Sequence, residues 1–243
     1  MVPRFVKPLV QSARLLVVIA AALVCLLLLL QLPAFSQDSI AAPDVPGSLA
    51  GRVTNAAGDP LAGIEVRLCY LSSCSRTALT GPDGRYEFLG LPPATYLVEF
   101  RDPSRVYAPQ FYGNVVDQAL ATGVVVSGNA VIDIDAVLAP GATVTGPISG
   151  VPAIGQSWYY VYLFRRSASL TWVYEGEYSS QGIATSLPYT FTGLAAGTYV
   201  ICGISAGEVG YFSECYQDLL ARAFYHPPAD AVGFPLAAGE TRR

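Results

Sequence analysis

The 243-residue chain is rich in apolar residues (52%), poor in charged residues (13%) and has a formal net charge of −4. All three basic residues before position 37 lie in a leader that has no acidic residue, so the remaining chain has 11 basic and 18 acidic residues, a balance of −7. This balance argues against nucleic-acid binding, which needs clustered cations, and against a polybasic membrane patch.

The first 36 residues have the pattern of an export signal. Basic residues precede a continuous apolar run over residues 15–30, and small residues at Ala34 and Ser36 predict cleavage before Gln37. The alternative is an uncleaved membrane anchor, for which the apolar run is slightly short. We therefore expect a secreted or cell-surface protein, with membrane contact only through this segment if it stays uncleaved.

The rest of the chain contains an internal repeat. Tyr86 and Tyr96 stand ten residues apart in a segment that matches the one containing Tyr189 and Tyr199, also ten residues apart. A repeat of about 94 residues has the size of a domain rather than of a solenoid element. The second copy ends near the point where its last strand would begin. The predicted organisation is a linker over residues 37–46 and two modules over 47–140 and 141–243.

Each module has the two-residue hydrophobic period of half-buried strands. Ile64, Val66 and Leu68 alternate with Glu65 and Arg67, for example. Many short strands separated by turn signals predict an all-β fold: two tandem Ig-like or prealbumin-like antiparallel β-sandwiches after an N-terminal signal helix. Residues 124–126 and 130–138 are expected to pair as a hairpin.

A motif in the first module resembles the carboxypeptidase regulatory-like and Cna B-type family. It consists of spaced glycine, proline and apolar positions followed by residues 80–96; the spaced positions are Gly51, Val53, Gly58, Pro60, Leu61, Gly63, Val66 and Leu68. The second module keeps the later half, over residues 182–199. The resemblance implies a transthyretin-like sandwich used in stalks, adhesin repeats or carbohydrate-binding-like domains. It also implies a Lys–Asn crosslink in many members, which we do not expect because the only lysine is Lys7.

No catalytic, metal or cofactor site is predicted. The only histidine, His226, precedes two prolines and is a poor candidate for a rigidly held catalytic base. Asp133 and Asp135 lie two apart, which places both on one face of a predicted strand. A contribution to Ca²⁺ binding would need further oxygen ligands, so a solvated strand face is the simpler interpretation.

The four cysteines beyond the leader are expected to form one disulfide in each module, because exported proteins favour pairing. Cys69 and Cys74 flank a four-residue turn, and Cys202 and Cys215 enclose a 12-residue loop. The alternative is that these thiols are buried and unpaired.

An aromatic stripe in the second module is the candidate binding surface. Aligning the modules places Tyr159, Val161 and Leu163 toward the core, so aromatic side chains replace charged ones on the outward face. Such a stripe can stack on sugar rings or anchor a protein, or it can pack against another part of the chain. The candidate contact residues are Trp158, Tyr160, Tyr162, Phe164, Trp172 and Tyr174.

The sequence therefore predicts an exported, non-catalytic protein for adhesion, display or carbohydrate contact. Its expected partners are a carbohydrate or another extracellular protein. Alternatives are an accessory fragment of an exported peptidase or glycoside hydrolase, or a purely mechanical spacer.

Overall fold

The computed structural model describes most of the chain after the predicted leader and shows an all-β fold, as expected. In the described part, the only helix is the single 3-10 turn η1 (Gln118–Leu120), and no helix there is long and apolar enough to cross a membrane. The predicted signal helix and His226 lie outside the described residues. These are residues 45–243 without 72, 129–130, 150–156, 183–185, 208–209, 216–218, 221–226 and 229.

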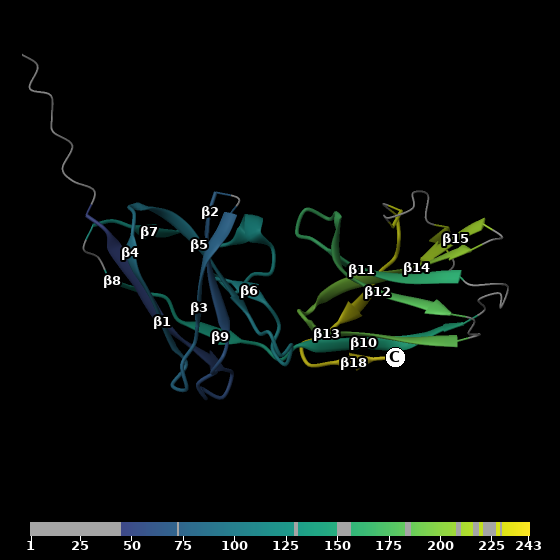
Figure 1. Cartoon of the computed structure of the whole chain (residues 1–243), viewed down its shortest axis with the longest axis horizontal. Helices are drawn as coiled ribbons and strands as arrows, with labels where there is room; N and C mark the ends of the chain where they lie inside the picture. Colours follow the sequence, from purple (N-terminus) through teal and green to yellow (C-terminus); the bar gives the residue numbers. More distant parts are fainter. Residues whose placement is uncertain are drawn as a thin grey trace, which may run out of the picture. The chain divides into compact units, whose positions relative to one another are not determined.

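Residues 47–138 form two sheets, which we call the N-terminal sheet pair (Figure 1). In the first sheet, β1 (Gly47–Asn55) lies between β4 (Arg85–Leu91) and the short strands β8 (Val131–Asp133) and β9 (Ala136–Leu138). The second has the order β3 (Ser73–Leu79), β2 (Glu65–Tyr70), β5 (Ala94–Arg101), β6 (Gln110–Phe111), and β7 (Val124–Val126) also pairs with β5.

The core of this pair follows from the alternating pattern of its strands. Val66 and Leu68 on β2 are buried, whereas Glu65 and Arg67 between them are only partly buried. Leu49 on β1 and Phe100 on β5 are fully buried in the same cluster. Alternate residues therefore fill the space between the sheets, as in other sandwiches.

Residues 142–242 form a second pair of sheets, the C-terminal sheet pair. One sheet has the order β13 (Ser186–Leu194), β10 (Ala142–Ser149), β18 (Thr241–Arg242). The other has the order β12 (Trp172–Gly182), β11 (Ser157–Arg166), β14 (Gly197–Gly207), β15 (Gly210–Cys215), β16 (Leu219–Leu220), and β17 (Phe234–Leu236) also pairs with β14.

The two pairs repeat the same strand register. Leu49 on β1 lies opposite Phe88, and Val144 on β10 lies opposite Phe191. On the other side, β8 runs parallel to β1, and β18 runs parallel to β10 at the matching position. The internal repeat in sequence is thus a repeat in topology, while the predicted module boundaries and the incomplete second module stay predictions.

The repeated tyrosines have a common role in the two pairs. The Tyr96 hydroxyl donates a hydrogen bond to the Pro92 carbonyl at 3.0 Å, and the Tyr199 hydroxyl donates to the Ala195 carbonyl at 2.8 Å. Each bond ties a strand to the turn four residues earlier, which resembles the tyrosine corner of other sandwiches.

Two local expectations for the end of the first module were wrong. Strand β7 pairs with β5 and strand β8 with β1, so residues 124–138 cross from one sheet to the other instead of forming a hairpin. Strands β8 and β9 are also separate and run parallel to β1. Where the predicted strand is interrupted, between β8 and β9, the Arg52 amide donates to the Asp135 carboxylate at 2.7 Å. Asp135 is therefore a backbone cap, and it does not share a continuous strand face with Asp133.

Candidate functional site

The predicted aromatic stripe forms a continuous ladder on one face of β11 and β12, which we call the outer aromatic face. The ring centroids of Trp158 and Tyr160 are 6.4 Å apart, and those of Tyr160 and Tyr162 are 6.1 Å apart, with nearly parallel planes in both pairs. Phe164 continues the ladder at 6.5 Å from Tyr162. Tyr174 of β12 contacts both Tyr162 and Phe164. Alternation along β11 thus gathers aromatic rings on one face, as predicted.

The opposite face of β11 belongs to the core, which also agrees with the predicted register. Tyr159, Val161 and Leu163 are each no more than 1% exposed. Val161 and Leu163 pack in the cluster between the two sheets of the C-terminal pair.

Exposure changes steeply along the outer aromatic face. Trp158 is 47% exposed and Tyr174 is 51% exposed, whereas Tyr162 is 7% and Phe164 1% exposed. The exposed rings are therefore Trp158 on β11 and Tyr174 on the edge strand β12, where Tyr174 lies opposite the buried Phe164. We call these two rings and the strand surface between them the open side of the face.

The closed end is a second small core on the outside of the sheet. Tyr162 and Phe164 cluster there with Val200 and with the cysteines of β14 and β15. Ala231, from the segment before β17, is 2% exposed and belongs to the same cluster. Sequence reasoning left open whether the stripe was exposed or packed; it is exposed at Trp158 and packed at Phe164.

The open side of this face, on the edge strand β12, carries negative charge. Glu177 lies opposite Tyr162 in the β11–β12 register and is exposed, and Ser179 lies opposite Tyr160. The pKa of Tyr174 is raised, first by partial burial and then by the nearby Glu177 carboxylate. The guanidinium of Arg166 lies 5.4 Å from the Trp172 ring, at the other end of the ladder. The face therefore combines exposed rings with a carboxylate.

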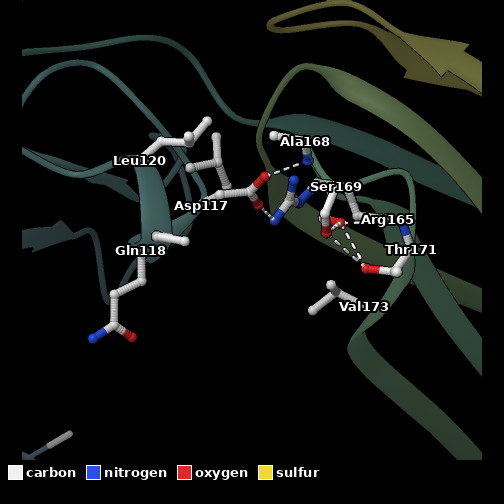
Figure 2. Close-up of a pocket in the computed structure, with 11 residues that line it drawn as sticks. Asp117, Gln118, Leu120, Arg165, Ala168, Ser169, Thr171 and Val173 are labelled. Carbon is white, nitrogen blue, oxygen red and sulfur yellow. Dashed lines mark hydrogen bonds and ion pairs between the residues drawn. The ribbon is translucent and has the colours of Figure 1, made fainter.

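A second cluster, which sequence reasoning missed, centres on Arg165 at the end of β11 (Figure 2). Its guanidinium donates to the Asp117 and Glu175 carboxylates, at 2.6 Å in each case. The other Asp117 oxygen accepts the Ala168 amide, also at 2.6 Å. Asp117 thereby links the loop before η1 to the β11–β12 turn. We call this the Arg165 cluster.

The charges of this cluster stabilise one another. Burial acts to raise the pKa of Asp117, but the Ala168 amide and the Arg165 guanidinium outweigh it and hold that pKa below its usual value. Burial likewise acts to lower the pKa of Arg165, and the two carboxylates overcome this effect and raise it. The arginine is 8% exposed, so its charge depends on both partners.

A cavity of about 560 Å³ lies beside the Arg165 cluster. Its wall includes Leu120 and Val173, together with hydroxyls of the β11–β12 turn. The Ser167 hydroxyl lies 2.8 Å from that of Thr171, and 2.9 Å from that of Ser169. The polar groups are thus engaged with one another, and the cluster joins two loops rather than presenting a free reactive group (Figure 2).

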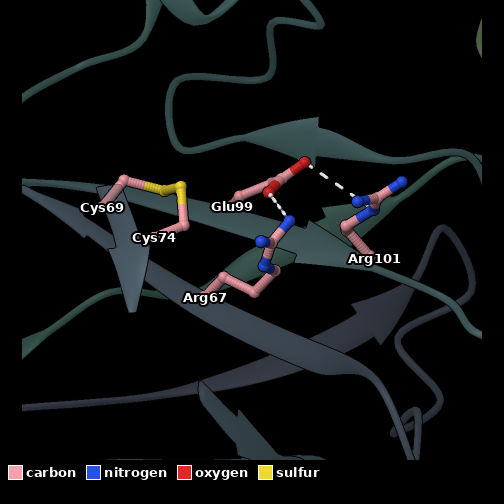
Figure 3. Close-up of a disulfide and its surroundings, with 5 residues drawn as sticks. All are labelled: Arg67, Cys69, Cys74, Glu99 and Arg101. Carbon is pink, nitrogen blue, oxygen red and sulfur yellow. Dashed lines mark hydrogen bonds and ion pairs between the residues drawn. A yellow bond between two sulfur atoms is a disulfide. The ribbon is translucent and has the colours of Figure 1, made fainter. Parts of the chain in front are cut away.

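The N-terminal sheet pair carries charges where the C-terminal pair carries rings (Figure 3). Arg67 lies at the β2 position that Tyr162 occupies on β11, and it pairs with Glu99 at 3.0 Å. Glu99 also contacts Arg101 at 3.7 Å. The same fold therefore supports a polar surface in one copy and an aromatic surface in the other.

The structure contains both disulfides at the predicted pairs. Cys69 is bonded to Cys74 across the β2–β3 turn, and Cys202 is bonded to Cys215 between β14 and β15 (Figure 3 shows the first). The sulfur atoms of Cys69 and Cys74 lie close to a Glu99 oxygen, a grouping that can resemble a metal site. The disulfide occupies both sulfurs, however, and arginines engage the carboxylate, so this grouping offers no thiolate ligand.

Comparison with known proteins finds a family match for one segment of the chain. Residues 48–139 match the family model of the carboxypeptidase regulatory-like domain. The family prediction is thereby confirmed for the N-terminal sheet pair. The matched segment, which we call the regulatory-like domain, contains strands β2–β9 and all of β1 except its first residue. No curated protein matches the chain.

Several solved structures match the chain at low sequence identity and low TM-score. A streptococcal ancillary pilin shares 14% identity at a TM-score of 0.36, over 83% of this chain and 64% of that one. The TIE protein of Bacillus anthracis shares 11% identity at a TM-score of 0.29, over 82% and 33%. A proposed carbohydrate-binding protein of Bacteroides uniformis shares 13% identity at a TM-score of 0.30, over 72% and 100%. The chain spans less than two thirds of the first two.

Proposed function

We propose that the protein is an exported, non-catalytic interaction protein that contacts a carbohydrate through the open side of the outer aromatic face. The observation that carries this proposal is the exposure of Trp158, which stacks on Tyr160, and of Tyr174, which contacts Tyr162, on one face of the sheet. Large rings exposed together on one sheet face are uncommon on a monomer surface unless they bind something. Aromatic rings give the apolar face of a sugar a dry contact at little entropic cost.

Export is supported by the disulfides and by the predicted leader. Disulfides form and persist in oxidising compartments, and both pairs are present in the fold. The match of residues 48–139 to a regulatory-like domain supports a non-catalytic role. The regulatory-like domain would then hold or space the binding module, because its corresponding face is charged.

A glycan array tests this function. The unmodified protein should bind at least one neutral or basic glycan, and Trp158→Ala should abolish that binding. Tyr70→Ala is a matched control, because Tyr70 is also half exposed but lies on β2 in the N-terminal sheet pair. Absence of any glycan binding by the unmodified protein would reject this function and leave the spacer or accessory-fragment alternatives.

A further inference from the structure

Among the described residues of β11 and β12, Glu177 is the carboxylate that lies between the exposed rings of the outer aromatic face. On β12, Glu177 follows Tyr174 on the same face and precedes Ser179, and across the register it faces Tyr162. Tyr160 is the next residue on this face of β11. Along the strand direction the carboxylate therefore stands between the two exposed ring positions, Trp158 and Tyr174, on the edge strand β12.

No cation of this chain compensates that carboxylate within the residues that the structure describes. Arg165 is engaged with Asp117 and Glu175, and Arg166 stacks on Trp172 at the closed end of the ladder. Ring faces carry negative electrostatic potential, which adds to the charge of Glu177. The open side of the face thus favours a ligand with positive charge.

We propose that the ligand of this face is a glycan that carries free, protonated amino groups, with the amine held between Glu177 and the exposed rings. This inference rests on the proposed carbohydrate function and adds the charge of the sugar. An acidic polysaccharide would be repelled by Glu177 and by the net acidic charge of the chain. A neutral sugar would stack on the rings and offer Glu177 only hydroxyl donors, without the charge that a protonated amine adds.

A lysine- or arginine-containing protein segment offers the same charge, but it fits the surface less well. One cationic side chain covers one ring, whereas Trp158, Tyr160 and Tyr174 present rings on two adjacent strands. An oligosaccharide can place the apolar faces of successive sugar rings on several of these aromatic side chains at once, with an amine within reach of Glu177. The glycan is therefore the better match to the surface.

Calorimetric titration with three oligosaccharides of equal length tests the inference. The ligands are oligomers of glucosamine, N-acetylglucosamine and glucose, which differ in whether the sugar carries a charged amine. We expect the glucosamine oligomer to bind about fivefold more tightly than the others, the gain of one cation–π contact and one exposed ion pair. Glu177→Gln should reduce this preference to about twofold, because only the cation–π contact remains, and it should retain weak binding of all three.

Glu87→Gln is the matched control, because Glu87 is an exposed strand glutamate of the N-terminal sheet pair and its replacement changes the net charge equally. It should leave the preference unchanged. Equal binding of the three oligomers by the unmodified protein, or an undiminished preference in Glu177→Gln, would overturn the inference while the carbohydrate function stands. Absence of binding to any oligomer, with Glu177-dependent binding of an oligolysine peptide, would overturn both in favour of a protein partner.

Discussion

Gly51 makes room for the hydrogen bond that closes the first sandwich. The Tyr86 hydroxyl donates to the Ile134 carbonyl at 2.6 Å and so ties β4 to the segment between β8 and β9. A Cβ atom at position 51 would lie 2.0 Å from the same carbonyl oxygen. Burial, and then the nearby carboxylates of Asp135 and Asp133, raise the pKa of Tyr86 well above its usual value. The phenol therefore stays a donor in alkaline solution.

Tyr86→Phe should lower the free energy of unfolding by about 1–2 kcal/mol, because it leaves the buried Ile134 carbonyl without its donor. Denaturant titration measures this loss. Tyr70→Phe, which removes a hydroxyl from a half-exposed ring, should change stability by less than about 0.5 kcal/mol. Equal effects of the two substitutions would show that the hydrogen bond contributes nothing.

Truncation of two residues on the outer aromatic face should lower stability by different amounts. Phe164→Ala should cost about 3–5 kcal/mol of stability, since its ring is 1% exposed and a cavity would remain. Trp158→Ala should cost less, about 1–2 kcal/mol, because 47% of its surface is already in water. Thermal melting of both variants checks the order. A large loss for Trp158→Ala would mean that its ring is packed, which removes it from the proposed binding surface.

At the scale of whole elements, the β14–β15 hairpin depends on its disulfide. The Cys202–Cys215 bond closes a longer loop than the Cys69–Cys74 bond, with sequence separations of 13 and 5. Replacing both cysteines of the longer loop by alanine should cost about 3 kcal/mol, and the same change in the shorter loop about 2 kcal/mol, in the chain-entropy model. Cys202 and Cys215 are also buried in the small core that contains Tyr162 and Phe164, which we call the outer core. The loss of their sulfurs there should widen the difference in stability between the two double variants.

Unfolding of the two double variants by denaturant, compared with that of the unmodified protein, measures these losses. Equal stability of the Cys202 and Cys215 double variant and the unmodified protein would contradict the assignment of the bond to the outer core.

Strand positions and strand faces were predictable because they depend on local alternation and on the repeat. Val66 and Val161 occupy equivalent places, so the inward face of one strand predicted that of the other. The cover over Phe164 was not predictable, because Ala231 reaches it from far along the chain without a local pattern. The Arg165 cluster was missed for the same reason: Asp117 and Arg165 lie 48 residues apart and neither belongs to a recognisable motif.

At the scale of the whole molecule, the Arg165 cluster links a loop of the regulatory-like domain to the C-terminal sheet pair. The folded pKa of Asp117 is lower than its unfolded value, so its contribution to stability is present above the unfolded pKa of about 3.9. It is lost as the pH falls through the lower folded pKa. Asp117→Asn should therefore cost about 1–3 kcal/mol at neutral pH, as expected for a charged hydrogen bond, and almost nothing in strong acid.

Denaturant titrations across an acid pH series measure this dependence. Asp133→Asn is the control, because Asp133 is exposed and its replacement makes the same change in net charge. A constant deficit for Asp117→Asn at every pH would show that the loss is one of packing rather than of charge.

The parallel pairing of β1 with β8 and β9 determines how the first sandwich responds to a pulling force. Strands that run in the same direction slide past each other when the chain is drawn apart at Gly47 and Leu138, so their hydrogen bonds are loaded in shear and must fail together. Three paired positions with β8 and three with β9 share that load, whereas β10 and β18 share two. Because Lys7 is the only lysine, no Lys–Asn crosslink joins these strands, and their hydrogen bonds carry the load. The regulatory-like domain should therefore unfold at a higher pulling force than the C-terminal sheet pair.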